Sequence, residues 1–226
     1  MPPKTPVQPA KSRVLIVDDH PMVRDWLGIL IGKQTDLTVC GEAASASEAM
    51  QLVAAQKPDI AIVDLSLEGK SGLELIKDLK ALHPNLPILV LSMHDESLYA
   101  ERVLRAGARG YVAKREATDK VMVAIRRILG GDIYVSDSLS AKIVRQAITG
   151  GESTAASPLS RLSDRELEVF QFIGRGKSTR QIAEVLNLDV KTIESYRTRV
   201  REKLGLESSR ELLQHAIQWV QSGGNG

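Results

Sequence analysis

Four short apolar runs in the first half of the chain each end on a side chain that could take part in phosphoryl transfer. Two runs end on carboxylates, one on a hydroxyl and one on an amine. In chain order, the terminal residues and the runs before them are Asp18 and Asp19 (14–17), Asp64 (60–63), Ser92 (88–91) and Lys114 (110–113). Apolar runs of this length predict strands buried on both faces, as in a parallel sheet. Because ligands collect at the carboxyl ends of such strands, we expect the five side chains to share one crevice.

The chemistry of this crevice would be metal-assisted phosphorylation. Neighbouring carboxylates repel each other, so a protein that places them together commonly uses them to hold a cation. Asp19 and Asp64, helped by Asp18, form a hard oxygen site suited to Mg²⁺, which keeps waters and leaves room for a phosphoryl group. Asp64 would be the nucleophile toward phosphorus, while Lys114 and Ser92 contact the phosphoryl oxygens. Any one of these residues alone would more often be structural, and only their combination predicts this chemistry.

Composition limits the class of protein. The 226 residues are 43% hydrophobic and 26% charged, which is ordinary for a soluble globular chain of one large or two modest domains. The single cysteine, Cys40, excludes an internal disulfide and is expected in the core, and the four histidines show no metal-ligand spacing. No long apolar segment or signal-peptide pattern occurs, so the sequence predicts a cytosolic protein with a flexible tail over residues 1–12.

The first 130 residues alternate strand runs with helical patterns. Helices are predicted near 21–34, 45–56, 71–82, 96–106 and 117–129, and a strand near 38–43 supplies the fifth run. This alternation predicts right-handed crossovers and an open sheet covered on both faces. For residues 13–131 we therefore expect an α/β, flavodoxin-like, doubly wound sheet of five parallel strands. The chain lacks a glycine fingerprint and a phosphate loop, which disfavours a nucleotide-binding domain.

The alternating pattern of strands and helices ends after residue 131. Residues 132–158 are predicted to be a linker that contains a short helix from Ser138 to Ile148. Residues 159–222 show no strand pattern and are predicted to form a small all-α domain of four helices. Up to residue 158 there are 19 basic and 19 acidic side chains, and beyond it 11 and 9, an excess that is only weak evidence for nucleic-acid binding. The helix starts are indicated by the capping pairs Ser163 with Glu166, Ser178 with Gln181 and Ser208 with Glu211, and by Asp189 as an N-cap.

Residues 12–131 resemble the receiver domain of bacterial two-component response regulators. The intervals between the acidic pair, the third-strand aspartate, the hydroxyl and the lysine are typical of that family. One departure is Arg115, where many receivers have a proline after the lysine. The resemblance implies phosphorylation by a partner histidine kinase. It further implies these roles: Asp64 as phosphoacceptor, Asp18, Asp19, Asp64 and the main-chain carbonyl of Ser66 as Mg²⁺ ligands, and Ser92, Tyr111 and Lys114 as switch residues.

Residues 160–222 are similar to the LuxR-type DNA-binding domain of the NarL/FixJ class. The segments 162–169, 176–183, 190–197 and 203–206 carry the match. Two helices joined by a short turn, the second of them basic, are the plan of a helix-turn-helix whose recognition helix enters the major groove. The residues that the resemblance brings to DNA are Lys177, Ser178 and Thr192 at phosphates, Glu194, Ser195, Thr198 and Arg199 at the groove, and Lys191 beside them.

Glu194 departs from the pattern of this class, because many members have lysine at its position. A carboxylate that faces DNA is repelled by the phosphates unless it accepts a hydrogen bond from a base, and cytosine N4 is the natural donor. One hypothesis is that Glu194 reads a cytosine. The alternative is that it lies at the rim and pairs with Lys191 or Thr198.

Three functional classes follow from these two segments. The leading one is a transcription regulator, not an enzyme, whose activity is controlled by phosphorylation. It is expected to form a homodimer when phosphorylated and to bind promoter DNA. The resemblance also allows RNA polymerase as a further partner. A second is a constitutive DNA-binding protein whose receiver only dimerises, although such a receiver need not keep the acidic pair and Lys114. A third is a Mg²⁺-dependent phosphohydrolase, which would need an acid near the leaving group, and Ser66 cannot serve as that acid.

Overall fold

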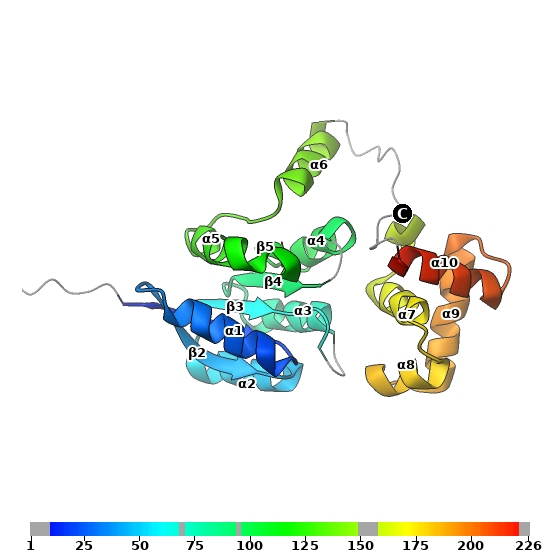
Figure 1. The fold of residues 1–226 in the computed structure, drawn as a ribbon, viewed down its shortest axis with the longest axis horizontal. Helices are drawn as coiled ribbons and strands as arrows, with labels where there is room; N and C mark the ends of the chain where they lie inside the picture. The colour runs from blue at the N-terminus through cyan, green and yellow to red at the C-terminus, as the bar shows by residue number, and fades with distance from the viewer. Residues whose placement is uncertain (1–9, 68–70, 94–95, 149–157, 222–226) are drawn as a thin grey trace, which may run out of the picture.

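The computed structural model describes residues 10–67, 71–93, 96–148 and 158–221. The first part of the chain forms one sheet in which all neighbouring strands are parallel, in the order β2-β1-β3-β4-β5. This order confirms the predicted flavodoxin-like architecture and brings the carboxyl ends of β1, β3, β4 and β5 to one edge (Figure 1). The strands are β1 (Ser12–Val17), β2 (Leu37–Ala43), β3 (Ile60–Val63), β4 (Ile88–Ser92) and β5 (Gly110–Ala113).

Five helices cover the sheet, and the strand residues explain why both of its faces are buried. Leu15, Ala61 and Val90 pack against α2, α3 and α4, whereas Ile16, Ile62 and Leu91 pack against α1 and α5. Successive strand residues thus enter opposite cores, which removes the polar alternation expected of a half-exposed strand. The helices are α1 (Pro21–Gly32), α2 (Ala46–Gln56), α3 (Gly72–Leu82), α4 (Glu96–Arg105) and α5 (Ala117–Leu129), with a short 3-10 helix η1 (Lys114–Glu116) after β5.

The last part of the described chain is all-helical. It contains the 3-10 helix η2 (Pro158–Arg161) and the helices α7 (Asp164–Gly174), α8 (Thr179–Leu186), α9 (Val190–Leu204) and α10 (Ser209–Gln221). Full capping boxes start α7 at Ser163 and α8 at Ser178, as the sequence predicts. Asp189 is the N-cap residue of α9, although its side chain accepts no capping hydrogen bond. Phe170 and Trp219 pack with ring centroids 5.7 Å apart and tie α7 to α10.

The segment after α5 stays on the sheet before it leaves the domain. Tyr134 forms a parallel bridge with Gly110, and the backbone N–H of Ser136 donates to Glu96 at 2.9 Å. Helix α6 (Asp137–Ile148) follows, close to the predicted short helix. Most of the predicted linker beyond it and most of the predicted tail, residues 149–157 and 1–9, lie outside the described residues.

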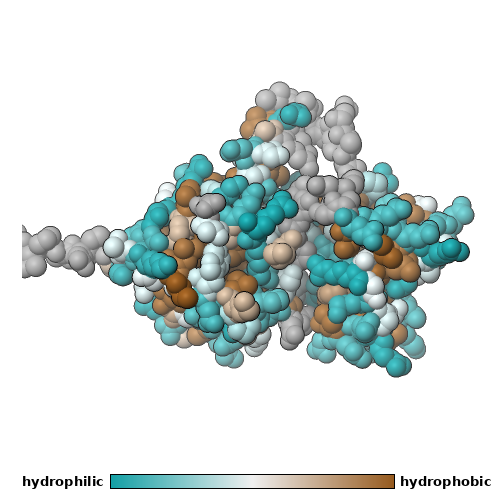
Figure 2. Space-filling model, viewed as in Figure 1, coloured by the Kyte–Doolittle hydropathy of each residue, from teal (hydrophilic) through white to brown (hydrophobic). Residues whose placement is uncertain are grey.

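Two further features concern the exterior of the molecule. Cys40 was expected in the core, but it is half-buried, because β2 is an edge strand of the sheet. Hydrophilic side chains dominate the face shown in Figure 2, where apolar ones gather over α1, on which Met22 and Ile29 are exposed. Among the described residues, no helix is long and apolar enough to cross a membrane.

Candidate functional site: an acidic crevice and a basic helix

The strand ends bring the predicted residues of the acidic crevice together. Asp18 follows β1 and Asp64 follows β3, and each is only 2% exposed. Lys114 begins η1 directly after β5, and its Nζ lies 2.7 Å from Asp18 Oδ2 and 2.8 Å from Asp64 Oδ2. One ammonium group therefore holds two buried carboxylates that come from different strands.

Burial decides the protonation chemistry of this pair. Desolvation raises the pKa of Asp64, and the nearby Asp18 charge acts in the same direction, while Lys114 and the Ser66 backbone N–H oppose the rise only in part. Burial also acts to lower the pKa of Lys114, but the charges and hydrogen bonds of Asp64 and Asp18 outweigh it and raise that pKa. Lys114 therefore stays charged. Ionisation of the buried Asp64 carboxyl lowers the free energy of unfolding.

The carboxylate oxygens of the crevice differ in their donors. Asp64 Oδ1 is buried and accepts no hydrogen bond, and buried Asp19 Oδ1 has only the His20 ring nitrogen beside it, at 2.6 Å. Asp18 Oδ1 accepts a hydrogen bond from the His20 backbone N–H at 3.0 Å. A cation can satisfy a buried anionic oxygen that has no donor, so this set of oxygens fits a divalent metal ion.

The sequence prediction missed one member of the group. Asp18, Asp19, His20 and Asp64 offer ligand atoms that all lie within 4.8 Å of one another. Histidine spacing gives no signal here, because the partners of His20 are carboxylates. The available signal was its position directly after the acidic pair.

Ser92 and Tyr111 lie where a change at the crevice could reach them. Ser92 is fully buried at the end of β4, and Tyr111 is 1% exposed in the neighbouring strand β5. The strand register pairs Val90 with Tyr111 and Ser92 with Ala113. Both residues therefore lie in the layer next to α4, the helix that follows β4.

The raised pKa of Asp64 leads to a testable pH dependence. Because the folded pKa lies above the unfolded value, folding favours the protonated carboxyl, and stability is lost as pH rises through this window. We expect Asp64→Asn to be more stable than the wild type at pH 7 without divalent cations, by on the order of 1 kcal/mol, and to lose this advantage near pH 4. Urea unfolding at both pH values measures the difference.

Asp36→Asn is the control of opposite sign. Hydrogen bonds from Arg126 lower the pKa of Asp36 to about 2, so wild-type stability at this exposed site is gained, not lost, as pH rises from 2 to 4. An Asp64→Asn variant that is less stable than the wild type at pH 7 would contradict the role of Asp64 as an ionised, desolvated carboxylate.

Most of the predicted DNA-contacting residues are exposed on α9. On α9, Lys191, Glu194, Ser195, Thr198 and Arg199 are exposed, and Thr192 is half-exposed. The turn before α9 is closed by Asn187, which adopts the left-handed conformation with φ 51°. Ser178 is exposed and is the N-cap residue of α8. The arrangement is a helix-turn-helix made of α8 and α9.

The structure bears on the two alternatives for Glu194. The Thr198 hydroxyl donates to the Glu194 backbone carbonyl at 3.1 Å, not to its side chain. Within the described ranges, no ion pair joins Glu194 to Lys191. The Ser195 hydroxyl is likewise occupied by the Lys191 carbonyl, at 3.0 Å. The Glu194 carboxylate is therefore an exposed acceptor on α9, and neither rim pairing is formed.

An ionic junction joins the two parts of the molecule. Asp164, the first residue of α7, lies 2.7 Å from Lys77 Nζ of α3 and 3.0 Å from Arg102 Nη1 of α4. Arg165 pairs with Glu74 of α3 at 2.8 Å. Burial opposes the ionisation of Asp164, but the hydrogen bonds from Lys77 and Arg102 outweigh it and lower its pKa. We call Asp164, Lys77 and Arg102 the junction cluster.

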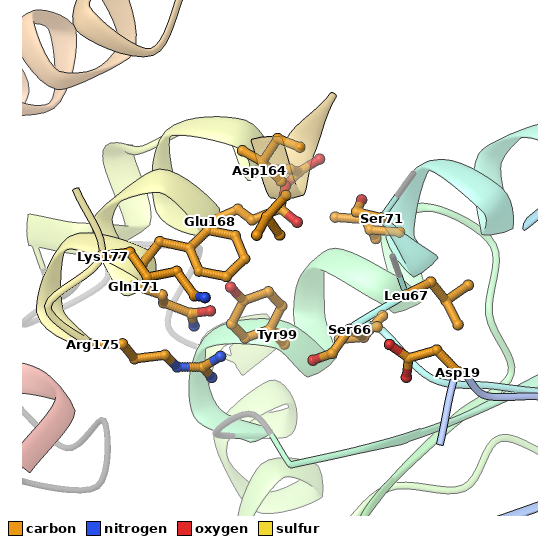
Figure 3. A pocket seen from close by; sticks show the side chains of 15 residues that line it. Asp19, Ser66, Leu67, Ser71, Tyr99, Asp164, Glu168, Gln171, Arg175 and Lys177 are labelled. Carbon is orange, nitrogen blue, oxygen red and sulfur yellow. The ribbon is translucent and has the colours of Figure 1, made fainter. Parts of the chain in front are cut away.

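A cavity of about 260 Å³ lies beside the junction cluster, between the acidic crevice and the helix-turn-helix. Figure 3 shows Asp19 and Ser66 on one wall, Gln171, Arg175 and Lys177 on the other, and Tyr99 of α4 between them. Lys177 Nζ lies 6.0 Å from the centroid of the Phe172 ring, and this lysine is half-buried. Lys177, a predicted phosphate contact, therefore lies at the junction between the two parts, whereas the outer face of α9 is exposed (Figure 1).

A parallel sheet with a lysine-bridged acidic crevice, linked to a helix-turn-helix, defines a phosphorylation-type receiver coupled to a DNA-binding domain. Comparisons with known families agree. Residues 14–126 match the model of the response regulator receiver domain, and residues 160–216 match that of the luxR family of bacterial regulatory proteins. The chain belongs to these families and is a response regulator of the NarL/FixJ class.

Similar proteins and solved structures support this assignment. The oxygen regulatory protein NreC of Staphylococcus aureus is 36% identical over 210 residues, which cover 91% of this chain and 97% of NreC. RcsB from Salmonella enterica serovar Typhimurium, solved bound to the promoter rprA with the phosphomimetic BeF₃⁻, is 27% identical with a TM-score of 0.66, over 92% of this chain and 99% of RcsB. A LuxR-family response regulator from Aurantimonas is 34% identical with a TM-score of 0.57, over 62% of this chain and 99% of that one.

Proposed function

We propose that the chain is a cytoplasmic transcription regulator in which Asp64 accepts a phosphoryl group from a partner histidine kinase. The observation that carries this proposal is the asymmetry of the Asp64 carboxylate. Its Oδ2 is held by Lys114 at 2.8 Å, whereas its buried Oδ1 accepts no hydrogen bond. Oδ1 is thus open to a cation or to an incoming group; the Asp64 carboxylate attacks phosphorus, and the imidazole of the kinase is the leaving group.

The side chains around Asp64 would bind the metal ion and the phosphoryl oxygens. Asp19 and Asp64, with the Ser66 main-chain carbonyl, would hold Mg²⁺, and Asp18 would act beside them, since its Oδ2 is already paired with Lys114. The ion supplies positive charge against the phosphoryl oxygens. Lys114 neutralises a further oxygen, and the Ser92 hydroxyl hydrogen-bonds another.

The chemistry is expected to stop at the aspartyl phosphate and its slow hydrolysis. A phosphohydrolase needs an acid that protonates the leaving group, and the residue two positions after Asp64 is Ser66. The product of the reaction is therefore a changed conformation and not a released metabolite.

Helix α4 is positioned to carry that change to the DNA-binding domain. It directly follows the segment after Ser92 and carries both Tyr99, buried in the junction, and Arg102, which binds Asp164 and the Leu159 carbonyl. A displacement of α4 would break these bonds. Separation of the domains would then expose Lys177 and permit two copies to place their α9 helices on half-sites about one DNA turn apart. RNA polymerase is a further partner at such a promoter.

The exposed Glu194 carboxylate gives a prediction about DNA sequence. A carboxylate accepts from cytosine N4, whereas a glutamine amide pairs with adenine N6 and N7. We expect Glu194→Gln to shift the preference at one base pair of each half-site from cytosine to adenine, with a discrimination of about 1–3 kcal/mol. Binding to a library of single-base operator variants measures it.

Glu202→Gln, an exposed change of the same kind at the far end of α9, is the matched control and should leave base preference unchanged. If Glu194→Gln tightens binding to every operator variant equally, Glu194 acts only through phosphate repulsion, and the base-reading role is wrong.

The proposed function is tested by selection from random DNA. The protein is treated with acetyl phosphate and Mg²⁺, and the DNA that it retains is sequenced beside that retained by Asp64→Asn. We expect enrichment of paired half-sites for the phosphorylated wild type only. Equal enrichment with both proteins would support a constitutive DNA-binding protein and overturn the proposed control by Asp64.

A further inference from the structure

Helix capping does not explain why His20 lies beside the acidic crevice. It is the N-cap residue of α1, where Ser, Thr, Asp or Asn would be favoured, and its side chain makes no capping hydrogen bond. Pro21 follows it at the first helical position and fixes the entry of the chain into the helix. The His20 side chain therefore does not serve the helix.

The imidazole instead faces the carboxylates. Its Nδ1 lies 2.6 Å from Asp19 Oδ1 and 3.3 Å from Asp18 Oδ1. The backbone N–H of His20 also donates to Asp18 Oδ1, so the residue is anchored to the acidic pair by its main chain. With 64% of its side chain exposed, the ring has room to reorient around an ion.

The carboxylate oxygens near this ring are poorly supplied with donors. Asp64 Oδ1 is buried and accepts no hydrogen bond, and Asp19 Oδ1 is buried with the His20 imidazole as its polar neighbour. All three side chains belong to the group whose ligand atoms lie within 4.8 Å of one another. A buried anionic oxygen without a donor and an imidazole nitrogen thus lie together beside the acidic pair.

We propose that His20 is a nitrogen ligand of the cation site, which makes the crevice a mixed oxygen and nitrogen site for divalent first-row transition-metal ions as well as Mg²⁺. The inference rests on the proposed function, since it uses the same carboxylates. Imidazole is a good ligand for Mn²⁺ through Zn²⁺ but a poor one for Mg²⁺, which prefers oxygen. His20 would therefore set which metal ion supports phosphorylation when several are present.

The direct test is pulsed EPR of the untagged protein with Mn²⁺. We expect electron–nuclear coupling from one directly bound ¹⁴N in the wild type and its loss in His20→Asn. Asparagine keeps a good N-cap, so α1 should remain intact, which circular dichroism checks. His83→Asn, at the C-cap of α3, and His94→Asn, near Ser92 in the sequence and outside the described residues, should both keep the signal.

Calorimetry provides a second readout that does not involve activity. The ratio of Ni²⁺ to Mg²⁺ affinity should fall about tenfold or more from wild type to His20→Asn, because even outer ligand partners change metal affinity 10–100-fold. The Mg²⁺ affinity itself should change little. Comparing this ratio between the wild type and the variant cancels the preference for Ni²⁺ that any oxygen site shows.

The outcomes separate this inference from the function on which it rests. Bound Mn²⁺ without nitrogen coupling, or coupling lost in His94→Asn and kept in His20→Asn, overturns the role of His20 and leaves the acidic site intact. If Mn²⁺ binding survives in an Asp19→Asn, Asp64→Asn double variant, the carboxylate site itself is wrong, and both proposals fail.

Discussion

Replacing Gly72 with alanine should destabilise the receiver domain by at least about 3 kcal/mol, more than most single substitutions. Gly72 is the first residue of α3, and its backbone N–H donates to the Leu65 carbonyl at 3.0 Å. A Cβ atom there would lie 2.0 Å from the Asp64 carbonyl oxygen and 2.7 Å from Leu65 Cα. Both neighbours are backbone atoms that cannot rotate away, so α3 must move away from Asp64 and the end of β3.

Urea unfolding of the two glycine variants tests this expectation. The matched control is Gly32→Ala at the end of α1, where a Cβ meets nothing within 4 Å. That change should be neutral or stabilising by up to about 1 kcal/mol, since alanine favours helix. Equal unfolding midpoints for the two variants would contradict the close approach of α3 to Asp64.

Loss of the Asp164 charge should open the junction between the two domains. Asp164→Asn keeps the length of the side chain and the Ser163–Glu166 capping box but removes the anion between Lys77 and Arg102. Hydrogen bonds to charged groups contribute about 1.5–3 kcal/mol, so the open fraction should rise roughly tenfold or more. We also expect about tenfold tighter DNA binding without phosphorylation, because Lys177 is released from the cavity.

Spin labels on either side of the junction measure this opening. In a Cys40→Ala background, cysteines replacing Lys57 and Arg210 report the interdomain distance by double electron–electron resonance. Glu101→Gln is the matched control, because Glu101 pairs with Arg105 on the same helix α4 and does not reach the second domain. If Asp164→Asn and Glu101→Gln give the same distance distribution and DNA affinity, the junction cluster does not hold the domains.

The sequence was most informative where burial follows a regular pattern. The apolar runs predict the parallel strands, and a parallel sheet by its topology places Asp64, Ser92 and Lys114 at one edge. Capping pairs likewise predict the starts of α7 and α8, because a cap depends on neighbours three residues apart. Because these rules act between near neighbours in the chain, the flavodoxin-like fold can be predicted from the sequence.

Other features depend on pairs that are distant in the sequence and leave no periodic signal. The contact of Asp164 with Lys77 and Arg102 joins residues more than 60 positions apart, and each alone resembles an exposed surface charge. His20 shows no histidine spacing, because its partners are carboxylates. Cys40 lies in a strand run that did not reveal its edge position in the sheet. Such features emerge only when the fold has set the neighbours.

Phosphorylation of Asp64 is expected to control DNA binding by the whole chain. The most direct measurement is the affinity of the full chain for a selected operator, with and without acetyl phosphate and Mg²⁺, with intact mass recorded on the same samples. We predict that the wild type gains the mass of one phosphoryl group and binds at least about tenfold more tightly, a coupling of about 1.4 kcal/mol, while Asp64→Asn gains neither. A phosphorylated wild type with unchanged affinity, or an Asp64→Asn variant that responds like the wild type, would show that phosphorylation of Asp64 does not control DNA binding.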